Sequence, residues 1–262
     1  MKRRLRFVLV SLTMGLAAAA IGSPLEPAEP RPAAVILISA NAEWAAVKAL
    51  FPAETYERSA FGEFFHKTVT SADGKTRPVI VFFGGWGKVS AAASAQYVLD
   101  RWKPDLLFNL GTCGGFAGAI ERGTIILVDR TVIYDVIERM SDPDETILEM
   151  STTIDLSWLR GPLPAGVKRM PLVSADQDLD PAAIPRLRAK YGAAAADWES
   201  GAIAYVAAKN KTRVLILRGV TDLVGASGGE AYGKIEVFEQ AAKTVMSRLF
   251  ADLPLWLAAA GR

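Results

Sequence analysis

The sequence is poor in the two side chains that most often bind metals or act as nucleophiles. Cys113 is the only cysteine and His66 the only histidine among 262 residues. One cysteine excludes an intramolecular disulfide and a cysteine metal cluster, and one histidine excludes a histidine-rich zinc site. A Ser-His-Asp triad would need His66 itself, which we interpret as a surface or packing residue. We therefore expect acid–base chemistry from carboxylates, with no metal and no cofactor.

Two nucleotide-binding motifs are also missing. The glycine-rich segment 84–87 lacks the GxGxxG spacing of dinucleotide sites, and the chain contains no Walker lysine motif. We find no internal repeat. The composition, with 51% hydrophobic and 22% charged residues, is that of an ordinary globular protein long enough to bury a full core.

The N-terminus has the pattern of an export signal. An apolar run over 7–21 ends in small residues and follows four basic residues, Lys2, Arg3, Arg4 and Arg6. A retained membrane anchor is the alternative, but the run is short and alanine-rich for a bilayer span. We therefore expect residues 1–22 to be a cleaved signal peptide and the protein to be exported to the periplasm.

The mature chain is expected to be a proline-rich linker over 23–33 followed by a single domain over 34–262. Loss of the four basic signal residues changes the balance to 26 basic against 28 acidic residues, a net charge of −2 instead of +2. This charge gives no reason to expect nucleic-acid binding. We also expect no stable membrane association once the signal is removed.

Apolar runs that alternate with helical patterns predict an α/β fold. The expected architecture has three layers, with a mixed, mostly parallel sheet and helices on both faces. The polar stretch 141–153 is expected to be a loop or lid, and Pro254 to end the last helix. The predicted strands are 34–39, 61–70, 78–83, 105–110, 123–136, 168–174 and 214–217, and the predicted helices follow residue 41 and cover 89–102, 181–191 and 238–249.

Two carboxylates flank one predicted buried strand. Glu199 begins an apolar helix, and Asp222 follows the apolar run Val214–Leu217. Strand ends and helix starts are where α/β folds place their sites, so the pair suggests chemistry on a polyol with a protonatable leaving group. The structural alternative is a helix-capping Asp197 and a turn-forming Asp222.

Two glycine-rich segments follow consecutive predicted strands. Residues 84–88 read Gly-Gly-Trp-Gly-Lys, and residues 111–115 read Gly-Thr-Cys-Gly-Gly. Glycine lets a ligand approach the backbone, and a loop that opens a helix can present N–H groups to anions or hydroxyls. Tight turns alone would also explain either segment.

In this order and spacing, four segments resemble the nucleoside phosphorylase and nucleosidase superfamily, most closely the methylthioadenosine/S-adenosylhomocysteine nucleosidases. They span nearly all of the mature chain: the first strand with Ala42-Glu43-Trp44, Gly84–Val89, Asn109–Phe116, and Asp197–Ser200 with Arg218 and Asp222. The resemblance implies a phosphorylase/hydrolase-like fold that binds a small-molecule nucleoside. It also implies a homo-oligomer, which we expect to be a homodimer.

The resemblance implies a role for each catalytic residue. Asp222 would protonate the departing base, Glu43 would activate water, and Arg218 and Thr112 would line the pocket around that water. These types suit the reaction, because N-ribosyl cleavage builds positive charge on the ribose and purine leaves poorly unless protonated.

The substrate-binding residues are also carried over from the resemblance. Glu199 would bind the ribose hydroxyls, and Trp198 stands where the family usually has a methionine against the sugar. The full expected set is Glu199, Trp198, Gly114, Gly115, Phe116 and Leu179. The family usually has an aromatic residue on adenine where this chain has Asp178. We interpret Asp178 as a helix cap and consider Phe116 or Tyr134 as the aromatic that grips the base.

The departures from the family favour water over phosphate as the nucleophile. Asn109 stands where bacterial purine phosphorylases have an arginine, and Glu43 would repel a phosphate nearby. The expected activity is hydrolysis of the N-glycosidic bond of a purine nucleoside. The alternatives are a phosphate-dependent phosphorylase and an exported nucleoside-binding protein without activity.

Overall fold

The computed structural model describes residues 31–140, 142–161 and 163–261. The expected signal peptide and most of the expected linker lie outside the described residues. The end of that linker is tied to the domain, because Arg31 pairs with Asp105 at 2.8 Å and the Ala33 N–H donates to the Pro78 carbonyl at 2.8 Å. The first strand begins at the next residue.

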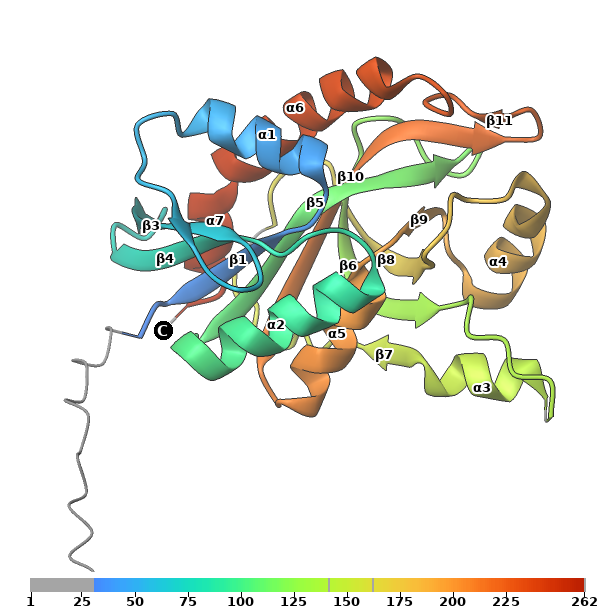
Figure 1. Ribbon diagram of the computed structural model, residues 1–262, viewed down its shortest axis with the longest axis horizontal. Helices are drawn as coiled ribbons and strands as arrows, with labels where there is room; N and C mark the ends of the chain where they lie inside the picture. Colours follow the sequence, from blue (N-terminus) through green and yellow to red (C-terminus); the bar gives the residue numbers. More distant parts are fainter. Residues whose placement is uncertain (1–30, 141, 162, 262) are drawn as a thin grey trace, which may run out of the picture. The chain divides into compact units, whose positions relative to one another are not determined.

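One mixed sheet of eleven strands forms the centre of this part of the chain (Figure 1). In chain order the strands are β1 (Ala34–Ile38), β2 (Glu57–Arg58), β3 (Glu63–Thr70), β4 (Thr76–Phe83), β5 (Leu106–Phe116), β6 (Ile125–Ile133), β7 (Ser151–Thr153), β8 (Val167–Ser174), β9 (Ala195–Asp197), β10 (Arg213–Gly225) and β11 (Gly228–Gly229).

The sheet is mixed, as the sequence predicts, but it also closes partly on itself, which the sequence does not predict. Strands β5 and β10 pair in parallel along most of their length. The other edge of β10 pairs antiparallel with β6, and the path β6–β8–β9 returns to β5. A bulge between Val220 and Asp222 interrupts the register of β10, and such bulges bend a strand and increase its twist. The closed part of the sheet therefore includes the strand that carries Asp222.

Helices cover both faces of the sheet, as the sequence predicts. Helices α1 and α6 pack together on one side, and α2 and α5 pack together on the other (Figure 1). No helix in the described ranges is long and apolar enough to cross a membrane. The helices are α1 (Asn41–Leu50), α2 (Lys88–Trp102), α3 (Pro143–Glu149), α4 (Ile184–Tyr191), α5 (Ser200–Lys209), α6 (Ile235–Ala251) and α7 (Leu253–Ala259), with a 3₁₀ turn η1 (Pro181–Ala183) before α4.

Three local predictions are wrong. The expected loop or lid over 141–153 contains helix α3 and strand β7, which pairs with β6. The expected glycine loop 111–115 lies inside β5, where its backbone pairs with β10. Asp222 lies within β10 rather than at its end, because the strand continues past the bulge to Gly225.

The expected end of the last helix needs a smaller correction. Helix α6 ends at Ala251, and Pro254 lies in the first turn of the additional helix α7. The first turn of a helix tolerates proline, because its N–H groups have no partner within the helix.

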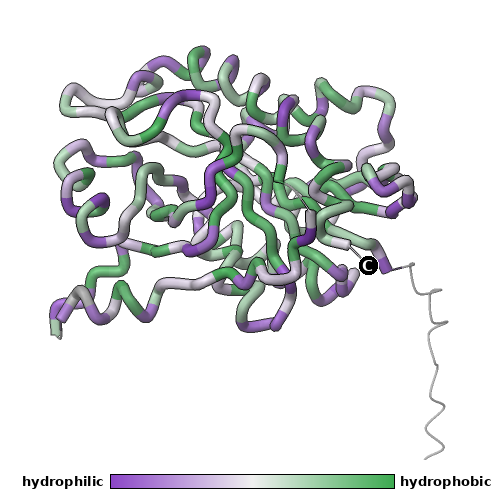
Figure 2. The backbone as a smooth tube through the Cα atoms, turned by 180° about the vertical axis from the view of Figure 1, so that it is seen from behind, coloured by the Kyte–Doolittle hydropathy of each residue, from purple (hydrophilic) through white to green (hydrophobic). Residues whose placement is uncertain are grey.

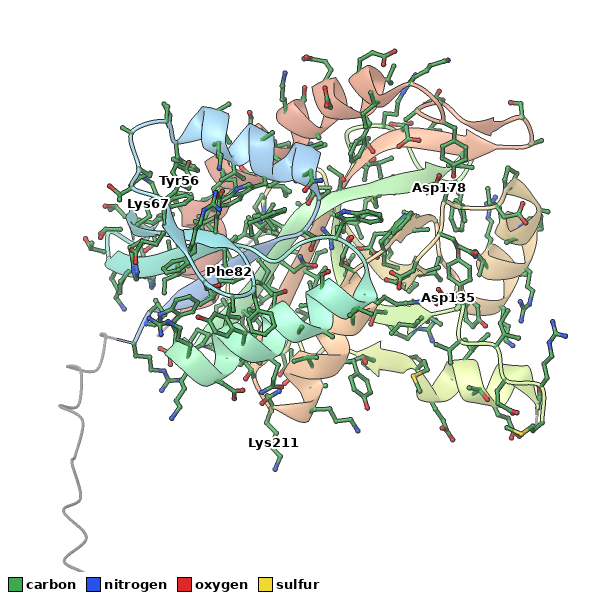
Figure 3. All side chains as sticks on the ribbon, in the orientation of Figure 1. Tyr56, Lys67, Phe82, Asp135, Asp178 and Lys211 are labelled. Atoms are coloured by element: carbon green, nitrogen blue, oxygen red, sulfur yellow. The ribbon has the colours of Figure 1, made fainter. Side chains whose placement is uncertain are left out.

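The core is continuous through the central strands. All five residues of β1 are buried, and each of its valine, isoleucine and leucine side chains contributes roughly 1.5–3 kcal/mol on burial. Figure 2 shows the apolar stretches running through the middle of the molecule, with polar residues on the outer loops and helices. Aromatic rings fill the region beside β3 and β4, where Trp44 stacks on Phe83 at 5.5 Å. In Figure 3 this region, marked by Tyr56 and Phe82, lies opposite the end that carries Asp135 and Asp178.

Candidate active site

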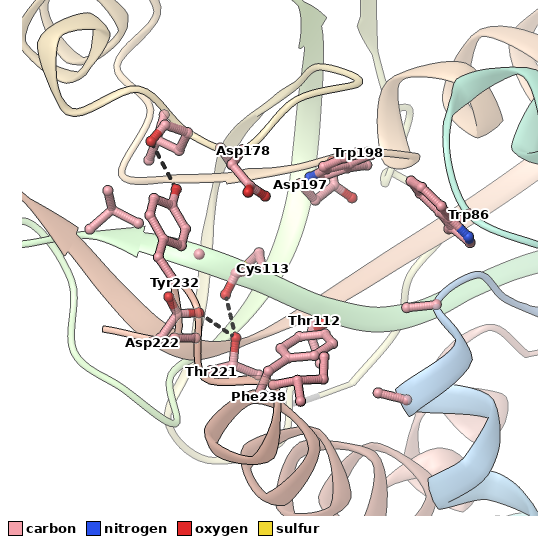
Figure 4. Close-up of a pocket in the computed structure, with 18 of the residues that line it drawn as sticks. Trp86, Thr112, Cys113, Asp178, Asp197, Trp198, Thr221, Asp222, Tyr232 and Phe238 are labelled. Carbon is pink, nitrogen blue, oxygen red and sulfur yellow. Dashed lines mark hydrogen bonds between the residues drawn. The ribbon is translucent and has the colours of Figure 1, made fainter. Parts of the chain in front are cut away.

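A cavity of about 740 Å³ brings most of the predicted site residues together (Figure 4). We call one part of its wall the glutamate end, which consists of Glu43, Thr112, Asp197 and Glu199. We call another part the aspartate end, which consists of Asp178, Asp222 and Tyr232. The two ends differ in burial and in hydrogen bonding.

Glu43 is fixed by hydrogen bonds to both of its carboxylate oxygens. It lies in the first turn of α1, where Oε2 accepts from the backbone N–H groups of Ala40 at 3.0 Å and Ser39 at 3.4 Å. Oε1 accepts from the Thr112 backbone at 2.6 Å and from the Thr112 hydroxyl at 2.8 Å. The side chain is only 2% exposed. A glutamate at this helix position can reach back to the cap, and here that reach directs its other oxygen onto β5.

Arg218 is the buried cation of the glutamate end, although it does not itself line the cavity. Its guanidinium is fully buried, with Nε 2.8 Å from Asp197 Oδ2 and Nη2 3.8 Å from Glu199 Oε2. Nη2 also donates to Asn109 Oδ1 at 2.7 Å. Burial alone would lower the pKa of Arg218, but Asp197, Glu43 and Glu199 raise it. The cation therefore stays charged and holds the acidic wall together.

Gly111 allows Arg218 and Glu43 to lie against the same point of β5. A Cβ atom there would collide with Arg218 Nη1 and come within 2.7 Å of Glu43 Oε1. Arg218 Nη1 is buried and has no hydrogen-bond partner within the described residues. A buried donor of this kind is costly unless it meets an acceptor, so this part of the glutamate end carries one unsatisfied donor.

Glu199 stands at the N-cap position of helix α5 and is buried at the cavity wall. Its Oε1 accepts the Gly87 N–H at 3.0 Å, and this N–H is directed by the positive φ of Gly87, 84°. Burial raises the pKa of Glu199 to about 8, with Asp197 and Glu43 contributing, although Arg218 acts in the opposite direction. The carboxyl group can therefore both accept and donate hydrogen bonds near neutral pH.

Asp197 has the helix-capping role that the sequence left open as an alternative. It ends β9, and its Oδ2 accepts the Ser200 N–H at 3.1 Å where α5 begins. The same oxygen pairs with Arg218, and Oδ1 accepts from the Ser174 hydroxyl at 2.6 Å. Its pairing with Arg218 was missed.

Asp222 is buried with fewer partners. It is 7% exposed, and the Thr221 hydroxyl donates to its Oδ1 at 2.8 Å. Burial is the main cause that raises the pKa of Asp222, and the carboxylates of Glu230 and Asp178 add to it. A carboxyl group with a raised pKa is a stronger candidate for a proton donor than an ordinary surface aspartate.

Two tryptophans form part of the cavity wall. Trp198 and Trp86 both line the cavity and meet edge to face, with ring centroids 5.3 Å apart. Trp86 comes from the segment before α2 and is 56% exposed. The flat ring of Trp198 thus lies at the cavity wall, at the position where the resemblance to the nucleosidases leads us to expect a flexible methionine.

The remaining predicted substrate residues divide into two groups. Gly114 and Leu179 line the cavity, and Gly115 and Phe116 do not. A Cβ atom on Gly115 would come within 2.7 Å of both Ile120 and Val220, so this glycine serves packing within the fold. Phe116 is fully buried in a separate apolar cluster that also contains Tyr134.

Asp178 does not cap the following helix, contrary to the sequence-based interpretation. The cap of η1 is Asp180, whose side chain accepts the Ala182 N–H at 2.9 Å. Asp178 instead lines the cavity and points into it in Figure 4. The prediction missed this because two aspartates lie within the same short turn before the helix.

The residues that could support other chemistry are poorly placed for it. His66 lies on β3 with a half-exposed side chain 3.6 Å from Glu57, which confirms its interpretation as a surface residue. Cys113 lines the cavity, but burial raises the pKa of its thiol far above neutral, so it is not a thiolate nucleophile. Within the described ranges, no group of three or more histidine, cysteine, aspartate or glutamate side chains could hold a metal ion.

Comparison with known proteins gives consistent results. The family model described as the phosphorylase superfamily matches residues 32–253. The 5'-methylthioadenosine/S-adenosylhomocysteine nucleosidase of Bacillus velezensis is 29% identical over 180 residues, covering 63% of this chain and 75% of its own. The 5'-methylthioadenosine nucleosidase of Arabidopsis thaliana superposes with a TM-score of 0.69 at 21% identity, covering 87% of this chain and 96% of its own. The futalosine hydrolase of Helicobacter pylori superposes with a TM-score of 0.65 at 16% identity, covering 84% and 96%.

Proposed function

Because this chain belongs to the phosphorylase superfamily, we propose that it hydrolyses the N-glycosidic bond of a purine nucleoside to the free base and a ribose derivative. The observation that carries the proposal is the placement of Glu43, Glu199 and Asp222 around one cavity. The names of the relatives support a methylthioadenosine- or S-adenosylhomocysteine-like substrate.

The glutamate end suits the ribose and the water. Glu199 would bind the ribose hydroxyls, held in place by the Gly87 N–H and by Arg218. The nearby Asp197 would also stabilise positive charge on the ribose ring, since buried, preorganised carboxylates act strongly on a developing cation, and Glu199 would add to this in its ionised form. Trp198 would pack against the sugar.

The reaction would proceed by cleavage of the bond between the base nitrogen and the anomeric carbon. The bonding electrons leave with the base, which takes a proton from Asp222. The oxygen of water bonds to the anomeric carbon, and Glu43 accepts the proton that this water releases. Thr112 holds Glu43 through two hydrogen bonds, so the carboxylate of Glu43 is already oriented before the water arrives.

The charges around the cavity favour water over phosphate. Lys234 is the only lysine or arginine among the lining residues of the described chain, against six carboxylates: Glu43, Asp178, Asp197, Glu199, Asp222 and Glu239. Arg218 is already paired with Asp197 and lies close to Glu199. An anion such as phosphate would enter this site against net repulsion. A phosphorylase is therefore the weaker alternative.

The test is a hydrolysis screen of adenosine, inosine, methylthioadenosine and S-adenosylhomocysteine, with and without phosphate. Release of free base together with free ribose or its derivative supports hydrolysis. Phosphate-dependent release of a ribose 1-phosphate would identify a phosphorylase. Micromolar binding of nucleosides without any base release would instead identify a binding protein, which would have no need for the buried Glu43.

We also propose that the protein is exported and acts in the periplasm as a homodimer. The N-terminal pattern of residues 1–22 supports export, and the family resemblance supports the dimer. Cell fractionation with N-terminal sequencing of the mature protein tests the first proposal, and light scattering tests the second. Protein retained in the membrane fraction with residues 1–22 intact would indicate an anchor.

A further inference from the structure

Aromatic rings are unevenly distributed around the cavity. Among the described residues, four aromatics line it, namely Trp86, Trp198, Tyr232 and Phe238. Trp86 and Trp198 contact each other, and Trp198 is next in sequence to Glu199. Tyr232 stands beside Asp222 and Asp178 in Figure 4. Of the four, Tyr232 is the ring placed at the aspartate end.

The two aromatics that the sequence suggested for gripping the base are not available to a ligand. Phe116 is fully buried and Tyr134 is 7% exposed. Both belong to an apolar cluster with Val132 and Val173, and neither lines the cavity. Asp178, which replaces the family's stacking aromatic, offers a carboxylate instead of a ring face.

Tyr232 is held in position by its hydroxyl group. The hydroxyl donates to the backbone carbonyl of Leu179 at 2.8 Å. Burial, with the charges of Asp178 and Asp222, raises the pKa of Tyr232 to about 12. The hydroxyl therefore keeps its proton at physiological pH and remains a donor. This bond ties the segment after β11 to the segment after β8, across the aspartate end.

The ring itself packs against Gly229. A Cβ atom on Gly229 would approach three atoms of the Tyr232 ring to 2.8 Å or less. Glycine is thus required for the ring to lie where it does. The ring is held by Gly229 at its edge and through its hydroxyl by Leu179. Tyr232 nevertheless remains 38% exposed, so part of its surface is open to the cavity.

We propose that Tyr232 is the residue that stacks on the base, and that it replaces the aromatic missing at Asp178. This role of Tyr232 rests on the proposed function, because it assumes that the same cavity binds the base of a nucleoside. Stacking of a base on an aromatic ring contributes about 5- to 150-fold in affinity, equivalent to ~1–3 kcal/mol. A two-ring purine offers more surface to stack than a pyrimidine. Leu179 then acts through its carbonyl, as the anchor of Tyr232.

The experiment measures binding of free adenine, free hypoxanthine and ribose by calorimetry, because base binding needs no turnover. Tyr232→Leu removes the ring, and Tyr232→Phe keeps the ring but removes the bond to Leu179. Tyr205→Leu is the matched control, since Tyr205 is 39% exposed on α5 and does not line the cavity. Circular dichroism checks that each variant is folded.

We expect Tyr232→Leu to weaken purine binding by about 5- to 150-fold and to leave ribose binding unchanged. Tyr232→Phe should stay within about fivefold of the native protein, below the stacking range. With a hydrolysed nucleoside, the loss in Tyr232→Leu should appear mainly in KM. Equal losses in Tyr232→Phe and Tyr232→Leu would overturn stacking in favour of a structural tether.

The outcomes separate this inference from the proposed function. Unchanged purine binding in Tyr232→Leu, or absence of purine binding in the native protein, overturns the stacking role even if nucleosides are hydrolysed. Purine binding that depends on the Tyr232 ring supports the stacking role even if no nucleoside is hydrolysed, in which case only the proposed reaction fails.

Discussion

The glutamate and aspartate ends of the cavity differ in how firmly their side chains are held. At the glutamate end, Glu43 accepts four hydrogen bonds, and Arg218 binds Asp197 while fully buried. At the aspartate end, Asp222 has one side-chain hydroxyl partner, and Tyr232 is partly exposed. One end is a rigid, buried network, and the other is assembled from loop residues around a single buried acid.

This difference matches the parts of a nucleoside that each end would meet. The ribose and the attacking water are the same for every ribonucleoside that is hydrolysed, so one rigid network can bind them whichever base is attached. The base differs between substrates, and loop segments can change their contacts without disturbing the core. The comparison predicts that changes at the glutamate end affect stability and reaction together, whereas those at the aspartate end affect the reaction alone.

The largest effect is expected at the aspartate end. Asp222→Asn keeps the shape of the side chain but cannot donate a carboxyl proton, so kcat should fall by about 10²- to 10⁴-fold with nucleoside binding retained. Steady-state kinetics and calorimetry measure the two quantities. Asp129→Asn, which alters a carboxylate paired with Arg169 outside the cavity, should leave both unchanged. Native-like turnover in Asp222→Asn would remove Asp222 from the mechanism.

The second prediction concerns the stability of the glutamate end. Arg218→Met leaves Asp197 and Glu199 buried without their cation, and such losses destabilise proteins by about 3–5 kcal/mol. Arg169→Met is the matched control, because Arg169 is largely exposed and its pair with Asp129 contributes about 0–1 kcal/mol. Urea denaturation measures both. Equal, small losses would contradict the rigid network.

The third prediction uses the pKa of Glu199, which burial raises from 4.5 to about 8. Between these values the folded protein binds more protons at this site than the unfolded chain. Its contribution to stability is therefore full below about pH 4.5 and is lost as pH rises through about 8. The stability of the native protein relative to Glu199→Gln should thus decline over this range, by at most about 1.4 kcal/mol per pH unit.

Urea denaturation of both proteins across the same pH range measures this difference. A constant difference would mean that the Glu199 carboxyl is not perturbed by its surroundings. A difference that grows with pH would mean that its pKa is lowered, with Arg218 outweighing burial.

Sequence predicted the glutamate end better than the aspartate end, for a physical reason. Glu43 and Glu199 lie at the starts of helices, and a helix start is a local pattern that the sequence itself shows. The pairing of Asp197 with Arg218 depends on β9 and β10 being brought together by the sheet. No local pattern shows that contact, although both residues lie in predicted motifs.

Apart from the misread Asp178, the errors at the aspartate end arise from contacts between distant parts of the chain. Apolar periodicity located β10, but the bulge that carries Asp222 follows from its register against β5. Tyr232 lies in a segment rich in glycine, and no local pattern places its ring beside Asp222. Its role depends on a hydrogen bond to Leu179, 53 positions away in the chain. The partial closure of the sheet is hidden for the same reason, since it depends on which strands become neighbours.

The smallest expected effect tests whether the rigid end admits an anion. Addition of phosphate should leave the rate of base release unchanged, because the glutamate end holds three carboxylates and the cation behind it, Arg218, is buried and already paired. The measurement is base release with and without phosphate, together with identification of the sugar product. Ribose 1-phosphate that accumulates in proportion to phosphate would show that Arg218 can exchange its carboxylate partners for an anion. The side chains of the glutamate end would then rearrange on binding an anion. The two ends would no longer differ in rigidity, and the glutamate end would not exclude phosphate as the nucleophile.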